Sequence, residues 1–280
     1  MDTPQQSGWQ LAGTGPESYE RHNVMAFMQT AQDLVTLAAL RPGERVLDVA
    51  CGTGVLARLA ATAVGPTGKV AGADLNEGML SVARTQAHQH EGPPIAWHTC
   101  DAAALTLPDR TCDVVLCQWG LEFFADRSRG LREIARVLVP GGRLVLRVWR
   151  AFDQQPFYVV LLNALERHLG AGTGAPIRAA FTLADPHELR TLVTGAGFAR
   201  VHIRITTNLL RFPSLERYVL GYLAATPVAA RVASMEEHSR TAMVREVAEG
   251  LHIYVDDDGL AAPIETHVVV AHTEGLGSAA

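Results

Sequence analysis

With 280 residues, the chain is long enough for one enlarged α/β domain or for a core with a cap. Its hydrophobic content of 48% is ample for a packed core, and a net charge of −5 without a basic stripe argues against a nucleic-acid partner. No apolar run approaches the roughly 20 residues of a membrane span, and the polar N-terminus does not resemble a secretory signal. We therefore expect a cytoplasmic protein without a membrane span.

The four cysteines, Cys51, Cys100, Cys112 and Cys117, have no metal-binding pattern around them. They form no C-x-x-C pair, and no histidines flank them at zinc spacing. Because they fall in or beside expected strands, we expect buried free thiols in a reducing compartment and no metal site.

The first clear element is a strand, a glycine turn and the start of a helix. Residues 1–16 are expected to be extended, and apolar residues at helical spacing predict helices over residues 17–40. Residues 46–49 are apolar except for Asp48, and the turn A-C-G-T-G follows at residues 50–54. Without Cβ atoms, Gly52 and Gly54 let the backbone bend sharply and let a ligand approach it. The following helix start offers unpaired N–H groups to an electron-rich partner.

The glycine pattern alone is ambiguous, because residues 52–57 also fit the G-x-G-x-x-A turn of dinucleotide-binding proteins. Two carboxylates separate the alternatives. Asp48 would repel a pyrophosphate by adding a second negative charge beside it. The same carboxylate would attract a ligand that has a charged amino group and a sulfonium. Asp74 lies twenty residues after Gly54, at the end of the strand expected over residues 69–73, where it can accept hydrogen bonds from both ribose hydroxyls.

The stretch V-L-D-V-A-C-G-T-G-V-L-A-R at residues 46–58 resembles the first motif of class I S-adenosylmethionine (SAM)-dependent methyltransferases. D-x-A-C-G-T-G is especially similar to the ubiquinone/menaquinone-biosynthesis type, within the small-molecule methyltransferases of types 11 and 25. Ala50 departs from the pattern, since many class I enzymes have glycine there, but a tight turn is still expected. The resemblance implies SAM as cofactor and an α/β fold: a seven-stranded, mostly parallel Rossmann-like sheet with helices on both faces and a helical cap.

The resemblance also assigns cofactor contacts to successive strand ends. Tyr19 is expected to close over the methionine end of SAM, and Met79 to lie against the adenine from a helix spanning residues 77–90. Asp101 and Ala102, after the strand at residues 95–99, are expected to bind the adenine. Gln118, after the strand at residues 113–117, is expected to contact the methionine part. The expected cofactor-binding residues are Tyr19, Asp48, Ala50, Gly52, Gly54, Asp74, Leu75, Met79, Asp101, Ala102 and Gln118.

The second half of the chain adds the remaining strands and two insertions. A helix at residues 127–138, a turn at 139–143 and a strand at 144–149 complete the L-x-P-G-G-x-L phrase of the same family. Further strands are expected at residues 201–205 and 265–272, the last one antiparallel. The expected units are an N-terminal helical lid segment (1–40), the SAM-binding core (41–150), a cap insertion (151–182), a core helix and strand six (183–212), a helical cap insertion (213–252), and the last strand with a tail (253–280).

The two insertions and the N-terminus are expected to pack into one lid over the strand ends, unless the second insertion serves a homodimer contact. Their aromatic residues suit a small, hydrophobic or aromatic acceptor, or form the ordinary core of the lid: Phe157, Tyr158, Phe181, Phe212, Tyr218 and Tyr222. The acceptor atom could be O, N or C. His22 is the preferred candidate for a general base among eleven histidines. A nicotinamide-dependent oxidoreductase and a non-catalytic SAM-binding protein are the alternatives.

Overall fold

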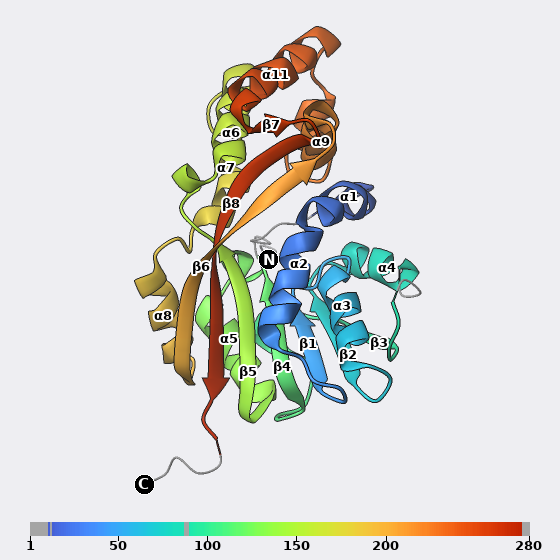
Figure 1. The fold of residues 1–280 in the computed structure, drawn as a ribbon, viewed down its shortest axis with the longest axis vertical. Helices are drawn as coiled ribbons and strands as arrows, with labels where there is room; N and C mark the ends of the chain where they lie inside the picture. Colours follow the sequence, from blue (N-terminus) through green and yellow to red (C-terminus); the bar gives the residue numbers. More distant parts are fainter. Residues whose placement is uncertain (1–10, 12, 87–89, 276–280) are drawn as a thin grey trace, which may run out of the picture.

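A computed structural model describes residues 11, 13–86 and 90–275, and it contains one large mixed sheet. The strand order is β3-β2-β1-β4-β5-β8-β6, and the short β7 pairs with β8 (Figure 1). The strands are β1 (Arg45–Val49), β2 (Lys69–Asp74), β3 (Ile95–Thr99), β4 (Cys112–Gln118), β5 (Leu138–Trp149), β6 (Phe198–Phe212), β7 (Val255–Asp256) and β8 (Gly259–Thr273). The expected fold class is confirmed, and the two-residue β7 is the one strand beyond the seven expected.

Helices cover both faces of this sheet and build a cap above it. The helices of the first half are α1 (Gly15–Tyr19), the π-helix η1 (Glu20–Val24), α2 (Met25–Ala38), α3 (Val55–Val64), α4 (Glu77–Thr85), η2 (Ala102–Ala104), η3 (Leu121–Phe123) and α5 (Arg127–Val137). Those of the second half are η4 (Phe152–Gln154), α6 (Pro156–Leu169), α7 (Ala175–Arg178), η5 (Ala179–Phe181), α8 (Pro186–Gly195), α9 (Leu215–Ala224), α10 (Ala229–Ala233), α11 (Glu237–Gly250) and η6 (His252–Tyr254).

The central strands pair in parallel, which brings their carboxyl ends to one edge of the sheet. Strands β1, β2, β3, β4 and β5 are parallel neighbours, while β8 runs antiparallel to both β5 and β6. Leu34 of α2 and Ala57 of α3 belong to the buried cluster on one face, and Leu131 of α5 and Val193 of α8 belong to the cluster on the other. Parallel strands buried on both faces read as continuous apolar runs, as in the V-V-L-C of β4.

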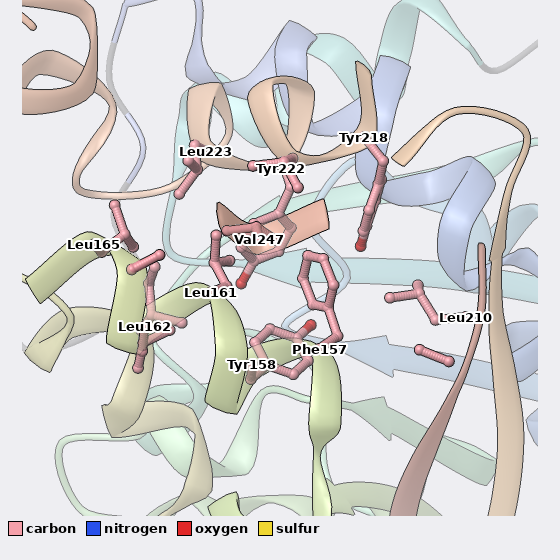
Figure 2. Packing of buried hydrophobic residues seen from close by; sticks show 14 of the residues in the cluster. Phe157, Tyr158, Leu161, Leu162, Leu165, Leu210, Tyr218, Tyr222, Leu223 and Val247 are labelled. Atoms are coloured by element: carbon pink, nitrogen blue, oxygen red, sulfur yellow. The ribbon is translucent and has the colours of Figure 1, made fainter. Parts of the chain in front are cut away.

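The cap is built on an extension of β6 and β8 beyond the sheet (Figure 1). These strands are longer than expected, because they continue to pair with each other as far as Phe212 and Leu260. Helices α9, α10 and α11 are inserted between them and pack against α6. Figure 2 shows this cluster, in which Phe157 of α6 meets Tyr218 and Tyr222 of α9.

Two other element boundaries differ from the sequence prediction, at the end of α4 and at the start of β5. Helix α4 begins at the expected cap, where the Asn76 side chain accepts from the backbone N–H groups of Gly78 and Met79, but it ends at Thr85. Of the helix expected over residues 77–90, residues 87–89 lie outside the described part. The expected turn at residues 139–143 belongs to β5, with a register shift against β4 between Cys112 and Val114.

Gly54 is required by the packing of the sheet rather than by an open space for a ligand. Its φ is +83°, and a Cβ there would lie 2.5 Å from Cη2 of Trp97 on β3. Gly43 has a similar φ of +85°, but the nearest atom to its Cβ position is Thr67 Oγ1 at 3.5 Å. Alanine at either position would have the strain of a left-handed backbone, but only alanine at Gly54 would also overlap a neighbouring side chain.

We expect Gly54→Ala to lower the free energy of unfolding by more than Gly43→Ala does. The left-handed backbone alone costs about 1–2 kcal/mol for a residue with a Cβ, and overpacking against Trp97 adds about 1–3 kcal/mol. Urea unfolding of both variants measures the difference. Equal losses would show that Trp97 moves aside without cost.

Candidate functional site

A cavity lies at the carboxyl ends of β1, β2, β3 and β4, between the sheet and the cap. Nine of the eleven residues that the sequence assigned to cofactor binding line it. They are Tyr19, Ala50, Gly52, Asp74, Leu75, Met79, Asp101, Ala102 and Gln118. The site is thus assembled from the N-terminal segment and four successive strand ends, as expected for an open α/β sheet.

The other two residues, Asp48 and Gly54, do not line the cavity. Asp48 is 1% exposed on β1, and its Oδ2 has no hydrogen-bond partner in the described part of the chain. Burial, and then the charge of Asp74, raise the pKa of Asp48 well above its usual value. A buried carboxyl of this kind is favoured as the neutral acid, so the expected attraction between Asp48 and a cationic ligand does not follow from this geometry.

The glycine turn is held in place by the carboxylate at the end of β2. Asp74 Oδ2 accepts a 2.8 Å hydrogen bond from the Gly52 N–H, and Oδ1 accepts another from Asn76 N–H. Burial raises the pKa of Asp74, although these backbone N–H groups and that of Leu75 oppose the shift. Asp74 therefore fixes the turn and also borders the cavity, where lone pairs remain for a ligand.

Ala50 adopts the backbone conformation that glycine would favour at this position. Its φ is +56°, and Trp119 on the neighbouring loop also has a positive φ of +53°. A Cβ on Gly120 would lie 2.5 Å from the Cβ of Ala50. Ala50 is thus accommodated because residue 120 is a glycine, which gives a physical reason for the departure at position 50. Strained residues of this kind persist where the surrounding structure over-determines them.

The N-terminal segment contributes a residue that the sequence did not single out. Asn23 lies in the π-helix η1, is 2% exposed, and lines the cavity together with Tyr19. Its Oδ1 has no partner in the described part of the chain. π-Helical turns often occur at functional sites, but no local signal in the sequence marks one here.

An ion pair between a buried arginine and a partly buried glutamate attaches this segment to the glycine turn. Arg58 of α3 is 6% exposed, and its Nη1 donates a 2.7 Å hydrogen bond to the Thr53 carbonyl oxygen. Its Nη2 lies 2.9 Å from Oε1 of Glu20 in η1. One guanidinium therefore holds the turn and the helical segment that carries Tyr19 and Asn23.

His22, the candidate base expected from the sequence, does not line the cavity. It packs on α9, where a Cβ on Gly221 would lie 2.5 Å from Nδ1 of His22. Burial, Arg21 and Arg217 lower its pKa. Among the described residues that line the cavity there is no histidine, lysine or arginine.

Aromatic side chains fill the other half of the cavity. Trp119 and Trp149 stack with ring centroids 4.6 Å apart, and Phe27 meets Trp119 edge-on at 4.6 Å. Of the lid aromatics expected from the sequence, Tyr158, Phe181 and Tyr222 line the cavity, whereas Phe157, Tyr218 and Phe212 pack within the cap. Three of these six rings therefore line the cavity, and the other three form part of the core of the cap.

Glu122 is a buried acid beneath this aromatic half. It is 5% exposed, and its Oε1 accepts a 3.0 Å hydrogen bond from the Trp149 N–H, while Oε2 has no partner in the described part of the chain. Burial raises the pKa of Glu122 to about 8. The neutral carboxyl thus anchors the end of β5 beside the cavity, without lining it.

Residues 18–155 match the model of the ubiE/COQ5 methyltransferase family. A demethylmenaquinone methyltransferase of Symbiobacterium thermophilum is 44% identical over 115 residues, which are 41% of this chain and 46% of that protein. The ubiquinone/menaquinone biosynthesis C-methyltransferase UbiE of Ectopseudomonas mendocina is 42% identical over 113 residues, 40% of this chain and 44% of that protein. The chain spans about half the length of the curated relatives that it matches.

Solved structures agree over most of the chain. A Bacillus halodurans protein described as a candidate methyltransferase superposes with a TM-score of 0.57 at 21% identity, covering 88% of this chain and 99% of its own. The protein has the class I SAM-dependent methyltransferase fold. A phosphoethanolamine N-methyltransferase of Haemonchus contortus has a TM-score of 0.59 at 17% identity, over 93% of this chain and 57% of its own. None of these matches supports the nicotinamide alternative.

The described residues contain neither a metal-binding cluster nor a membrane-spanning helix. No group of three or more His, Cys, Asp or Glu side chains among them could hold a metal ion. None of the helices in the described ranges is both long and apolar enough to cross a membrane. The four cysteines are free thiols, and Cys100 lines the cavity.

We expect Glu122→Gln to reduce the loss of stability with rising pH. Between pH 4.5, the usual pKa, and about 8, the folded protein keeps a proton that the unfolded chain releases, so the free energy of unfolding falls as pH rises. The slope from this group is at most about 1.4 kcal/mol per pH unit. Urea unfolding from pH 5 to 9 measures it, with exposed Glu249→Gln as control. Identical slopes in both variants would contradict the assignment.

We expect Arg58→Met to destabilise the fold by roughly 1–3 kcal/mol, because it leaves the Thr53 carbonyl and Glu20, whose side chain is 16% exposed, without their partner. Arg45→Met is the matched control. It removes the Arg45–Asp113 pair, whose side chains are 39% and 29% exposed, and should cost no more than about 1 kcal/mol. Chemical unfolding compares the two. A similar small loss in both would show that Arg58 does not hold the N-terminal segment.

Proposed function

We propose that this protein transfers a methyl group from SAM to an O, N or C nucleophile of a small hydrophobic or aromatic molecule. The observation that carries the proposal is the composition of one cavity. Carboxylates at the ends of adjacent strands, Asp74 and Asp101, line the same space as an aromatic compartment to which both the core and the cap contribute. The matches to ubiE/COQ5 methyltransferases over residues 18–155 support it independently.

The residues present fit SAM as the cofactor. Gly52 lines the cavity and has no Cβ, so its backbone is open to a ligand. A Cβ placed there would lie 3.4 Å from Cε of Met79, which lines the same cavity. Asp74 would hold the ribose hydroxyls, and Asp101 with Ala102 would hold the adenine. Tyr19, Asn23 and Gln118 border the remaining part, where amide and hydroxyl groups suit the methionine portion. Buried Oδ1 of Asn23 and Oε1 of Gln118 lack partners in the described part of the chain, as expected if a ligand completes this region.

SAM supplies both the methyl group and its leaving group. The protein's own contribution is therefore to hold two molecules in line and to exclude water, which can account for about 7–11 kcal/mol of the barrier. The aromatic half performs the second task, because Trp119, Trp149 and Phe181 present apolar surface to the cavity. His22 does not border this space, and we do not propose it as a base.

We expect Asp74→Ala to weaken binding of S-adenosylhomocysteine by about 1–3 kcal/mol, since it removes an acceptor for the ribose and a support of the Gly52 turn. Glu77→Ala is the control, because this carboxylate lies three residues away and its side chain is 58% exposed. Calorimetric titration of both variants with S-adenosylhomocysteine and with NADH tests the site. Preference for NADH, or unchanged affinity in Asp74→Ala, would overturn the proposal.

A cytoplasmic location and a homodimer contact through the second insertion are further predictions from the sequence. Light scattering of the purified chain measures its mass in solution. A monomeric mass would remove the dimer contact from the proposal.

A further inference from the structure

The cap contributes few polar groups to the cavity. Its lining residues are Tyr158, Ile177, Ala180, Phe181 and Tyr222. Among these described residues, the two tyrosine hydroxyls are the polar side-chain groups, and no cationic side chain lines any described part of the cavity. The acidic residues Asp74 and Asp101 lie at the strand ends, on the side that we assign to the cofactor. The acceptor side is therefore aromatic, with two hydroxyls and no counter-charge.

Neighbouring rings hold both tyrosines in place. Tyr158 meets Trp149 and Phe181 edge-on, with ring centroids 5.2 Å away in each case. Tyr222 lies 5.7 Å from Tyr158 and 5.8 Å from Phe157. Tyr158 is 2% exposed and Tyr222 is 4% exposed, and burial raises the pKa of both phenols. The two hydroxyls also interact with each other, because their hydrogen bond adds to the rise in the pKa of Tyr158 and opposes the rise for Tyr222, which makes Tyr158 the donor and Tyr222 the acceptor. The O–H of Tyr222 is thus held in place on this side, and it can donate to a ligand at little further entropic cost.

We infer that Tyr222, oriented by Tyr158, determines acceptor specificity by donating a hydrogen bond to an uncharged oxygen, a carbonyl or hydroxyl, of a planar acceptor. The inference rests on the proposed function and names its substrate class. A phosphate or carboxylate would enter this half without a cation to pair with, which makes its burial costly. A hydrocarbon of the same shape would leave the Tyr222 O–H without an acceptor, and sites built to bind a polar group reject analogues that lack it.

Tyr218 provides an internal control on the same helix. It lies one turn before Tyr222 in α9, is 0% exposed, and does not line the cavity. Its hydroxyl has no partner in the described part of the chain, and its ring packs 4.3 Å from that of Phe212. Figure 2 shows Tyr218 and Tyr222 side by side on α9, with Phe157 below them. The change to phenylalanine is therefore chemically identical at the two positions, but only Tyr222 borders the cavity.

The test compares 1-tetralone, which has a carbonyl oxygen, with tetralin, which has the same bicyclic shape without it. Equilibrium dialysis with saturating S-adenosylhomocysteine gives the Kd of each probe for the wild type, Tyr158→Phe, Tyr222→Phe, the double variant and Tyr218→Phe. We expect the wild type to bind tetralone at least fivefold more tightly than tetralin. The double variant should bring this ratio near 1 with the tetralin Kd changed less than twofold, and Tyr218→Phe should keep the wild-type ratio.

Three results would overturn the inference: a wild type that does not distinguish the probes or binds neither, a double variant that keeps the ratio, or a Tyr218→Phe variant that loses it. Failure of the proposed function gives a different result, namely no binding of S-adenosylhomocysteine. Repeating the dialysis without S-adenosylhomocysteine separates the two, since the tyrosines belong to the cap and their preference for tetralone does not require the cofactor.

Discussion

The buried guanidinium of Arg58 is the interaction on which the assembled site depends. It reaches the Thr53 carbonyl on one side and Glu20 on the other, so the turn after β1 and the π-helix η1 are held by the same side chain. Tyr19 and Asn23 flank Glu20 along the chain, and they border the cavity only while this segment stays on the core. A buried charge is costly unless it is paired, so the pair constrains where the N-terminal segment can lie.

Close backbone packing is the second constraint around the cavity. Gly54 leaves room for the Trp97 ring, and Gly120 leaves room for the Ala50 methyl group. Ala50 and Trp119 both have positive φ, on adjacent loops at the ends of β1 and β4. Such conformations cost of order 1–3 kcal/mol each and are kept where the surroundings impose them. Here they place Trp119 against Trp149, which forms a wall of the aromatic compartment.

Much of the fold could be read from the sequence, because local signals specify it. The glycine turn, the apolar run of β4 and the Asn76 cap all fall where expected, since each depends on residues within a few positions. The site was harder to predict where segments that are far apart in the sequence meet. No sequence signal indicated that Trp97 would occupy the space beside Gly54, or that Asp48 would be buried and would not line the cavity. Nor did any signal indicate that Asn23 of η1, rather than His22, would line the cavity. These outcomes are set by packing between elements far apart in the chain.

The way the cap joins the sheet has a structural consequence. Helices α9, α10 and α11 leave from the end of β6 and return at the start of β8, and these two ends are held as hydrogen-bonded neighbours at Phe212 and Leu260. Both junctions of the insertion are therefore fixed by the strand ladder, whatever lies between them. A change in these helices would leave the strand ladder in place, but it would reach the N-terminal segment through the contact between Gly221 of α9 and His22 of η1. The ends of β2 and β3, at which Asp74 and Asp101 lie, do not depend on these helices for their position in the sheet.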